Sequence, residues 1–243
     1  MILPVGDSPN PPGTAWVTYT VIAINVLVYL LTLPLGARAA DPRDPEFVRY
    51  LQVVGEERGL GREQLRQLGL QVSEYDLLVF ERGFRPAQPS PVDLLTSIFL
   101  HAGLMHLAGN MLFLWIYGDN VEHRLGRLGF ALLYLATGVV ASGGDALLRA
   151  GSNLPSVGAS GAISGVLGLY FLWFPHNRVR LWFLLPPFVQ IFELPARVVL
   201  GFYLVVENLW PLLWSRGDGG ISYGAHIGGF VAGLTAAFLI SRL

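Results

Sequence analysis

The chain has 243 residues, of which 53% are hydrophobic and 14% are charged, and its formal net charge is −1. Soluble domains carry about 25% charged residues, so this chain lacks the charge to cover a soluble surface, and an integral membrane protein is the class that fits. The near-neutral charge provides no basic field for nucleic acid. The sequence contains neither Cys nor Lys, which excludes disulfides, Cys-ligated metals and a Ser–Lys dyad.

Hydropathy predicts an all-α polytopic membrane protein. A transmembrane helix needs about 20 apolar residues, and the sequence predicts six of them, at about 15–34, 95–117, 127–148, 159–174, 196–214 and 221–241. Residues 1–14 form a short N-terminal tail, and an even number of spans places both termini on one side. Residues 35–94 form a long hydrophilic first loop, with a short helical pattern around 46–68.

The connector 175–194 is apolar but too short to span, and Pro186 and Pro187 interrupt it. We expect it to lie along the membrane interface or to pack against the bundle.

Arginine counts leave the orientation open. On the side of the termini the short loops carry six Arg against two on the other side, which favours cytoplasmic termini. Adding the first-loop Arg near span ends changes the count to six against seven, so the rule alone does not decide.

Polar side chains inside spans are functional suspects because they are costly there. The second predicted helix carries His101, His106 and Asn110, the fourth carries Ser160 at its opening, and the sixth carries His226. Helices two, four and six of a six-span chain run parallel, and all these residues lie in the N-terminal halves. The topology therefore predicts that they lie at similar depth.

This set of groups suits acyl transfer. A serine becomes a nucleophile when a neutral histidine lies within about 3 Å, and side-chain or backbone N–H donors can stabilise the oxyanion. The pairs Gly161/Gly165 and Gly229/Gly233 have the small-xxx-small spacing that lets helix backbones approach closely. A Ser160–His226 contact between helices four and six needs such an approach.

Four motifs, in order along residues 90–241, resemble the rhomboid family of intramembrane serine proteases in its basic six-helix bacterial type. They are HAGLMHLAGN at 101–110, YGDNVEHR at 117–124, GASG at 158–161 and AHIGGFVAG at 225–233. The resemblance implies a six-helix bundle whose catalytic core covers residues 95–241.

It also implies a Ser160–His226 dyad, with Ser160 as nucleophile and His226 as base and acid. His106, Asn110 and the Ser160 backbone N–H would form the oxyanion hole. The supporting residues would be His101, Gly158, Gly161, Gly229 and Gly233.

By the same resemblance, the partners are the lipid bilayer and transmembrane protein substrates. No cofactor or metal is implied, and the five His residues are too scattered for a metal site. The expected location is the cell membrane, as a multi-pass protein whose active site opens to the extracytoplasmic side. Oligomeric state and substrate identity are not determined.

Other interpretations stay open. The chain could be an inactive relative that captures transmembrane clients, or a small transporter with polar groups at the midplane. His101 is expected to be a structural hydrogen-bonder that holds the first loop, and Ser164 a packing residue. Glu207 could line a water cavity or substrate gate, or be a plain interfacial carboxylate. Asp145 is expected to cap a helix or face the headgroups.

Overall fold

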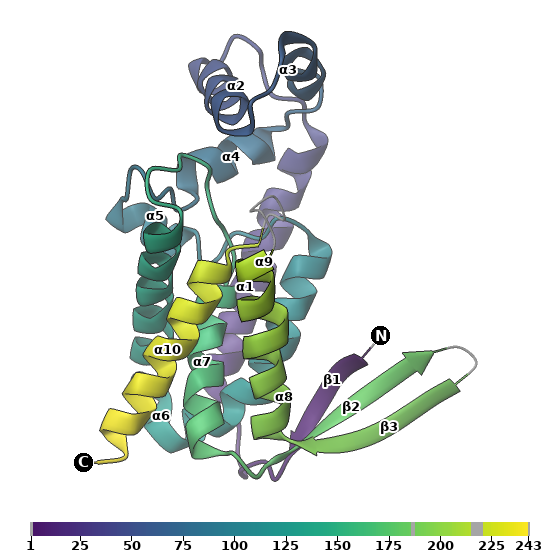
Figure 1. Ribbon diagram of the computed structural model, residues 1–243, viewed down its shortest axis with the longest axis vertical. Coiled ribbons are helices and arrows are strands. Elements are labelled where there is room, and N and C mark those ends of the chain that lie inside the picture. Colours follow the sequence, from purple (N-terminus) through teal and green to yellow (C-terminus); the bar gives the residue numbers. More distant parts are fainter. Residues whose placement is uncertain (1, 186–187, 215–220, 243) are drawn as a thin grey trace.

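The computed structural model describes residues 2–185, 188–214 and 221–242. Figure 1 shows a bundle of upright helices, with small helices at its upper end and a β-sheet beside its lower end. The helical segments are α1 (Trp16–Thr32), η1 (Leu33–Ala37), α2 (Pro45–Arg58), α3 (Arg62–Gly69), α4 (Glu74–Arg82), α5 (Pro91–Thr96), α6 (Leu104–Leu148), α7 (Ser160–Trp173), α8 (Ala196–Phe202), η2 (Tyr203–Leu209), α9 (Trp210–Trp214) and α10 (Tyr223–Ile240).

Within the described residues, four helical segments are long and apolar enough to cross a membrane. They are Trp16–Ala37, Leu104–Leu148, Ala196–Trp214 and Tyr223–Ile240. The 45 residues of α6 would extend about 68 Å at 1.5 Å per residue, roughly twice the thickness of a hydrocarbon core. The backbone of Gly126 inside it is non-helical, with φ 73° and ψ 165°.

The two arms of α6 are antiparallel, because its two ends reach the same loop. A Cβ built on Gly158 would meet His106 near the start of α6, while Ser156 donates to Asp145 near its end. Gly126 therefore marks the reversal, and the arms correspond to the second and third predicted helices. Six transmembrane crossings stay a prediction, since α7 has only 14 residues.

The predicted start of the second helix at residue 95 is wrong. Helix α5 ends at Thr96, and α6 begins only at Leu104. Between them the carbonyl of Ser97 accepts the N–H of Gly158 at 2.8 Å, so this backbone bonds to the loop before α7 instead of continuing a helix. The predicted end at 117 is also early, because helical backbone continues to the Gly126 interruption.

Helix α7 lies at the centre of the bundle, and each residue from Gly161 to Tyr170 is buried. Its contact with α10 is backbone to backbone. A Cβ on Gly229 would overlap the carbonyl oxygen of Gly161, and a Cβ on Gly233 would overlap that of Gly165. The two glycine pairs thus provide the close approach that their spacing predicts.

The prediction of an all-α fold is wrong in one respect, because a three-stranded antiparallel sheet accompanies the helices. Its order is β1 (Ile2–Ser8), β2 (Arg178–Leu185) and β3 (Phe188–Pro195). Apolar and basic residues alternate along 178–181, so buried Val179 and Leu181 pack into the core while Arg180 is exposed. The predicted N-terminal tail thus contains β1, and the 175–194 connector contains most of β2 and β3. Pro186 and Pro187 of that connector lie outside the described residues.

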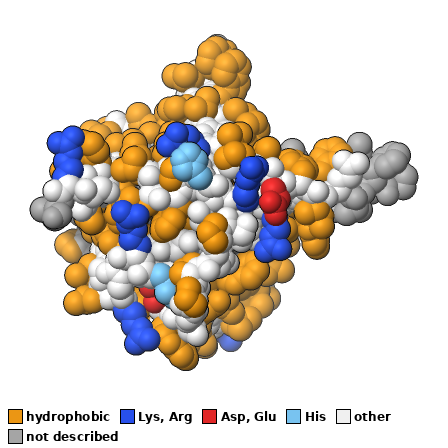
Figure 2. Space-filling view, turned by 90° about the horizontal axis from the view of Figure 1, so that it is seen from below, with side chains coloured by type: hydrophobic (Ala, Val, Ile, Leu, Met, Phe, Trp, Pro, Cys, Tyr) orange, Lys and Arg blue, Asp and Glu red, His pale blue; other side chains and the backbone are white. Residues whose placement is uncertain are grey.

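Strand β1 is anchored by a buried carboxylate. Asp7, 2% exposed, accepts hydrogen bonds from the Tyr170 hydroxyl and from Asn120 Nδ2, the latter at 2.9 Å. Burial raises the pKa of Asp7 to about 6. Figure 2 views this lower end of the molecule, where arginine side chains outnumber acidic ones.

The first loop folds into short helices with a small core of their own. This core consists of Ala40, Phe47, Val72 and Leu77. Asp44 caps α2 with Pro45 at its first position, and Gly59 ends it with a positive φ of 61°. Ser73 and Asp76 form a capping box at α4. The helical pattern predicted around 46–68 corresponds to α2 and α3.

Candidate active site

Ser160 and His226 meet at the interface of α7 and α10. The Ser160 hydroxyl oxygen lies 2.8 Å from Nε2 of His226. Ser160 is the first residue of α7, and His226 lies in the first turn of α10, where its N–H donates to the carbonyl of Ser222. Ser160 is half-buried, and the residues of α7 that follow it, from Gly161 to Tyr170, are buried.

His106 and Asn110 are one turn apart on α6 and approach the same place from the other side. A Cβ built on Gly158 would lie 2.6 Å from His106 Cε1 and 3.7 Å from Asn110 Nδ2. The φ of Gly158 is +130°, so a side chain there would be both crowded and strained. The structure thus brings together four of the predicted residues, Ser160, His226, His106 and Asn110.

The amide of Asn110 is an unusual donor. Asn110 is 8% exposed, and its Nδ2 is buried without a hydrogen-bond partner among the described residues. A buried unpaired donor costs free energy, and a catalytic role or a bound water is among the explanations for such a group. Helix α7 has no side-chain cap, so its first N–H groups are also available beside Ser160.

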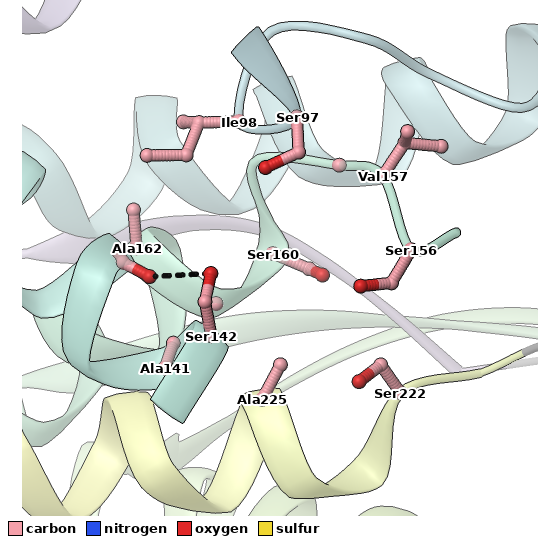
Figure 3. A pocket seen from close by; sticks show the side chains of 13 residues that line it. Ser97, Ile98, Ala141, Ser142, Ser156, Val157, Ser160, Ala162, Ser222 and Ala225 are labelled. Carbon is pink, nitrogen blue, oxygen red and sulfur yellow. Dashed lines mark hydrogen bonds between the residues drawn. The ribbon is translucent and has the colours of Figure 1, made fainter. Parts of the chain in front are cut away.

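A small cavity of about 30 Å³ lies next to Ser160, with room for a water molecule. Figure 3 shows the Ser160, Ser156 and Ser222 hydroxyls around it, from α7, the loop before α7 and the residue before α10. Ser97 and Ser142 also line the cavity. It therefore combines the candidate nucleophile with several polar hydroxyls.

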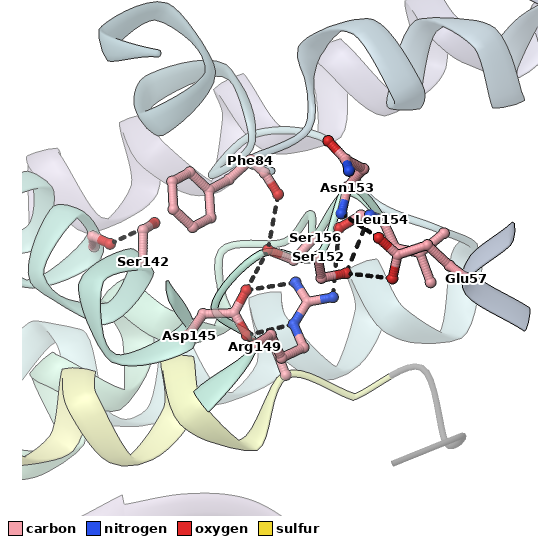
Figure 4. A network of polar contacts seen from close by, with 11 residues as sticks. Glu57, Phe84, Ser142, Asp145, Arg149, Ser152, Asn153, Leu154 and Ser156 are labelled. Atoms are coloured by element: carbon pink, nitrogen blue, oxygen red, sulfur yellow. Dashed lines mark hydrogen bonds and ion pairs between the residues drawn. The ribbon is translucent and has the colours of Figure 1, made fainter. Parts of the chain in front are cut away.

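Behind the site, Asp145 ties three elements together. It is 1% exposed and accepts from the hydroxyls of Ser156 and Ser222 and from the guanidinium of Arg149. Figure 4 shows Asp145 with Ser156 and Arg149 beneath Phe84 of the first loop, whose carbonyl accepts the Ser156 N–H. The expectation that Asp145 faces headgroups is therefore wrong, because its buried carboxylate accepts hydrogen bonds from donors inside the protein.

His101 lies just before α6 and is 1% exposed. Its backbone carbonyl, not its ring, accepts from the first loop, through the Tyr75 hydroxyl at 2.7 Å. The ring packs edge-on against His106, with 5.2 Å between centroids. It thus supports His106, while a different part of the residue holds the loop. Ser164 packs inside the bundle as expected, hydrogen-bonded to the Tyr203 hydroxyl at 2.9 Å.

Sequence reasoning selected Glu207 and missed its neighbour. Glu207 is exposed and does not line the cavity beside Ser160, which favours the plain-carboxylate interpretation. Asn208 is 1% exposed, and its Oδ1 lies 2.7 Å from Nδ1 of His226. An amide inside a predicted span was a usable signal, because polar groups at that depth are costly.

The family model for the Rhomboid domain matches residues 88–243. This match covers well over half of the chain and includes all the residues that meet at Ser160. The chain belongs to the rhomboid family. Membership accounts for the four motifs and for the helical bundle that holds them.

Curated rhomboid relatives match part of the chain at moderate identity. Rhomboid protease GluP of Bacillus subtilis is 38% identical over 144 residues, which are 59% of this chain and 25% of that protein. Rhomboid protein 1, mitochondrial, of Saccharomyces cerevisiae is 32% identical over 162 residues, 63% of this chain and 43% of that protein. The human presenilin-associated rhomboid-like protein, mitochondrial, is 32% identical over 144 residues, covering 58% and 36%. The chain thus spans less than half the length of each.

Proposed function

We propose that this rhomboid-family chain is an intramembrane serine endopeptidase that cleaves transmembrane-anchored proteins through a Ser160–His226 dyad. The observation that carries the proposal is the 2.8 Å contact between the Ser160 hydroxyl and His226 Nε2, inside a bundle of apolar helices. A serine hydroxyl this close to a histidine can lose its proton as it attacks a carbonyl. The name of the relative GluP includes the word protease, which supports the same activity.

In the first step, the Ser160 oxygen bonds to the scissile carbonyl carbon as its proton moves to Nε2 of His226. The carbonyl π electrons move onto its oxygen, which becomes the oxyanion. Asn110 Nδ2, the His106 ring and the Ser160 N–H are the proposed donors to it, and the buried unpartnered amide of Asn110 supports this role. His226 then protonates the leaving amine as the C–N bond breaks.

Water completes the reaction. A water molecule attacks the acyl-enzyme carbonyl and gives its proton to His226, and Ser160 leaves with that proton as the acid product forms. The small polar cavity beside Ser160 supports this step, because it has room for a water molecule within a buried site.

We further propose six crossings of the cell membrane, with the site open to the extracytoplasmic side. The Ser160 end of the bundle carries the first-loop helices, and at the opposite end arginine side chains outnumber acidic ones (Figure 2). The short loops of that opposite end hold six Arg against two at the Ser160 end, which favours the cytoplasm, whereas adding the first-loop Arg near span ends makes the count six against seven. Two of the relatives are named as mitochondrial proteins, so labelling of each face in cells is the direct test.

The proposed activity can be tested without a known substrate. Purified protein, in detergent and in liposomes, is treated with a fluorophosphonate probe, and the adduct is mapped by mass spectrometry. We expect the adduct on Ser160 in the wild type, none in Ser160→Ala or His226→Ala, and retained labelling in Ser164→Ala, a buried serine one turn away. With a transmembrane substrate that the wild type cleaves, Asn110→Ala should slow peptide-bond cleavage by about 10²–10³-fold.

Folded wild-type protein that stays unlabelled, while an active rhomboid protease reacts, would refute the proposal. The client-binding interpretation would then take its place, and capture of transmembrane segments without cleavage would be the activity to measure.

A further inference from the structure

The helix that follows the sheet changes its winding beside the site. Residues Tyr203–Leu209 form a π-helical segment, η2, between α8 and α9. A π turn holds an extra residue, and such turns are frequent at functional sites. Here Glu207 is exposed, whereas the next residue, Asn208, is 1% exposed and directed at His226.

The two hydrogen bonds of Asn208 fix which of its amide atoms faces the histidine. Nδ2 donates to the backbone carbonyl of Tyr203 at 2.8 Å, and a carbonyl oxygen can only accept. The amide atom that faces Tyr203 is therefore the nitrogen, and the oxygen Oδ1 is the atom that lies 2.7 Å from Nδ1 of His226. Since Oδ1 can only accept, Nδ1 must carry the proton.

This assignment determines the state of the other ring nitrogen. A neutral imidazole with its proton on Nδ1 has a lone pair on Nε2, which here faces the Ser160 hydroxyl at 2.8 Å. That is the tautomer a base needs in order to accept the serine proton. When Nε2 takes that proton, the Nδ1–H bond to Asn208 can persist, so the ring keeps its orientation through the step.

We propose that Asn208 is a positioning residue that holds His226 in the Nδ1–H tautomer, with its Nε2 lone pair directed at Ser160. The inference rests on the proposed serine-protease function. Asn208 does not touch the reacting atoms and acts only through the histidine. Asn208 thus takes the place, in this chain, of the third group that orients the base in serine hydrolases that have a triad.

The first experiment compares the fluorophosphonate labelling rates of the wild type, Asn208→Leu and Glu207→Gln. Leucine has a similar size but no acceptor for Nδ1–H. We expect labelling of Asn208→Leu to be slower by about 10- to 100-fold, which corresponds to the loss of one buried hydrogen bond to the base. Glu207→Gln is the matched control in the same segment. It changes the exposed neighbour of Asn208, which does not line the cavity beside Ser160, and it should label within about twofold of the wild type.

The second experiment reads the tautomer directly. Nitrogen-15 NMR of histidine-labelled protein, with His226 assigned by its loss in His226→Gln, should show Nδ1 protonated and Nε2 unprotonated in the wild type. Asn208→Leu should shift His226 towards the Nε2–H form. A merely structural role for Asn208 would not change this signal selectively at His226.

Two results would overturn the inference. One is a folded Asn208→Leu protein that labels at the wild-type rate. The other is an Nε2–H tautomer of His226 in the wild type, a measurement that needs no Asn208 variant to fold. Failure of the protease function is distinguishable, because the wild-type serine would then not react while the tautomer would still report on the hydrogen bond.

Discussion

Replacing the buried Asp145 by alanine tests whether the network behind Ser160 holds the site together. The carboxylate accepts from Arg149 Nε at 2.9 Å and Nη2 at 2.5 Å, from the Ser156 hydroxyl at 3.0 Å, and from the Ser222 hydroxyl. Asp145→Ala removes all of these bonds at once. The serine hydroxyls can then rotate to other acceptors, but the guanidinium loses its ion partner.

The expected cost is about 3 kcal/mol. Breaking a buried ion pair by removing one partner costs about 3–5 kcal/mol, and each hydrogen bond to a charged group contributes about 1.5–3 kcal/mol. The side chain of Arg149 is 32% exposed, so water can solvate it in the variant, and this moves the cost to the lower end of that range.

Equilibrium unfolding in mixed micelles measures this cost, with Glu63→Ala as the matched control. Glu63 also binds two guanidinium nitrogens of an arginine, Arg66, at 3.0 and 3.1 Å, but the two side chains are 69% and 67% exposed. Exposed pairs contribute about 0–1 kcal/mol. Equal losses of unfolding free energy in Asp145→Ala and Glu63→Ala would refute the argument from burial.

The same variant should also affect the reaction. Ser222 precedes His226 by four residues, and Ser156 precedes Ser160 by four, so Asp145 restrains the segments that lead to both members of the dyad. We expect folded Asp145→Ala protein to react with the fluorophosphonate probe more slowly than Glu63→Ala protein. Identical rates would show that these segments hold their positions without the network.

Three further predictions concern stability. Glu122 accepts from the N–H groups of Val17 and Thr18 at the start of α1, so Glu122→Ala should lower the free energy of unfolding by about 1–2 kcal/mol while leaving Ser160 labelling unchanged; a fully stable variant would contradict this capping role. Gly233→Ala should lower the free energy of unfolding by about 1–3 kcal/mol or more, because the new Cβ would overlap the backbone of α7. Gly143→Ala, with open space at its Cβ, should be neutral or slightly stabilising. Equal effects of the two variants in unfolding titrations would contradict the packing argument. Burial raises the pKa of Asp7 to about 6 from 3.8, so the folded state binds this proton more tightly than the unfolded state does. The free energy of unfolding should therefore fall by roughly 2–3 kcal/mol as pH rises from about 4 to about 6. Asp7→Asn should remove this pH dependence, and a pH dependence that persists in the variant would assign it to another group.

The sequence by itself determined much of the helical framework. Hydropathy located the cores of α1, α7 and α10 to within a few residues, because twenty consecutive apolar residues have few alternatives to a membrane helix. Glycine spacing also predicted the close α7–α10 contact, since only residues without a Cβ let two backbones touch. Ser160, His226, His106 and Asn110 were identified because costly polar groups at membrane depth are conspicuous in an apolar sequence.

The tertiary structure decided the features that depend on partners distant in the chain. The strand β2 forms because its alternating residues pair with both β1 and β3, and the start of α6 moves to Leu104 because Ser97 bonds to Gly158. Asn208 faces His226, while Glu207 does not, because a local π turn rotates the helix in a way that no hydropathy pattern records. Periodicity determines which segments are helices, whereas the winding of each helix and the partner of each buried polar atom are fixed only when the segments pack.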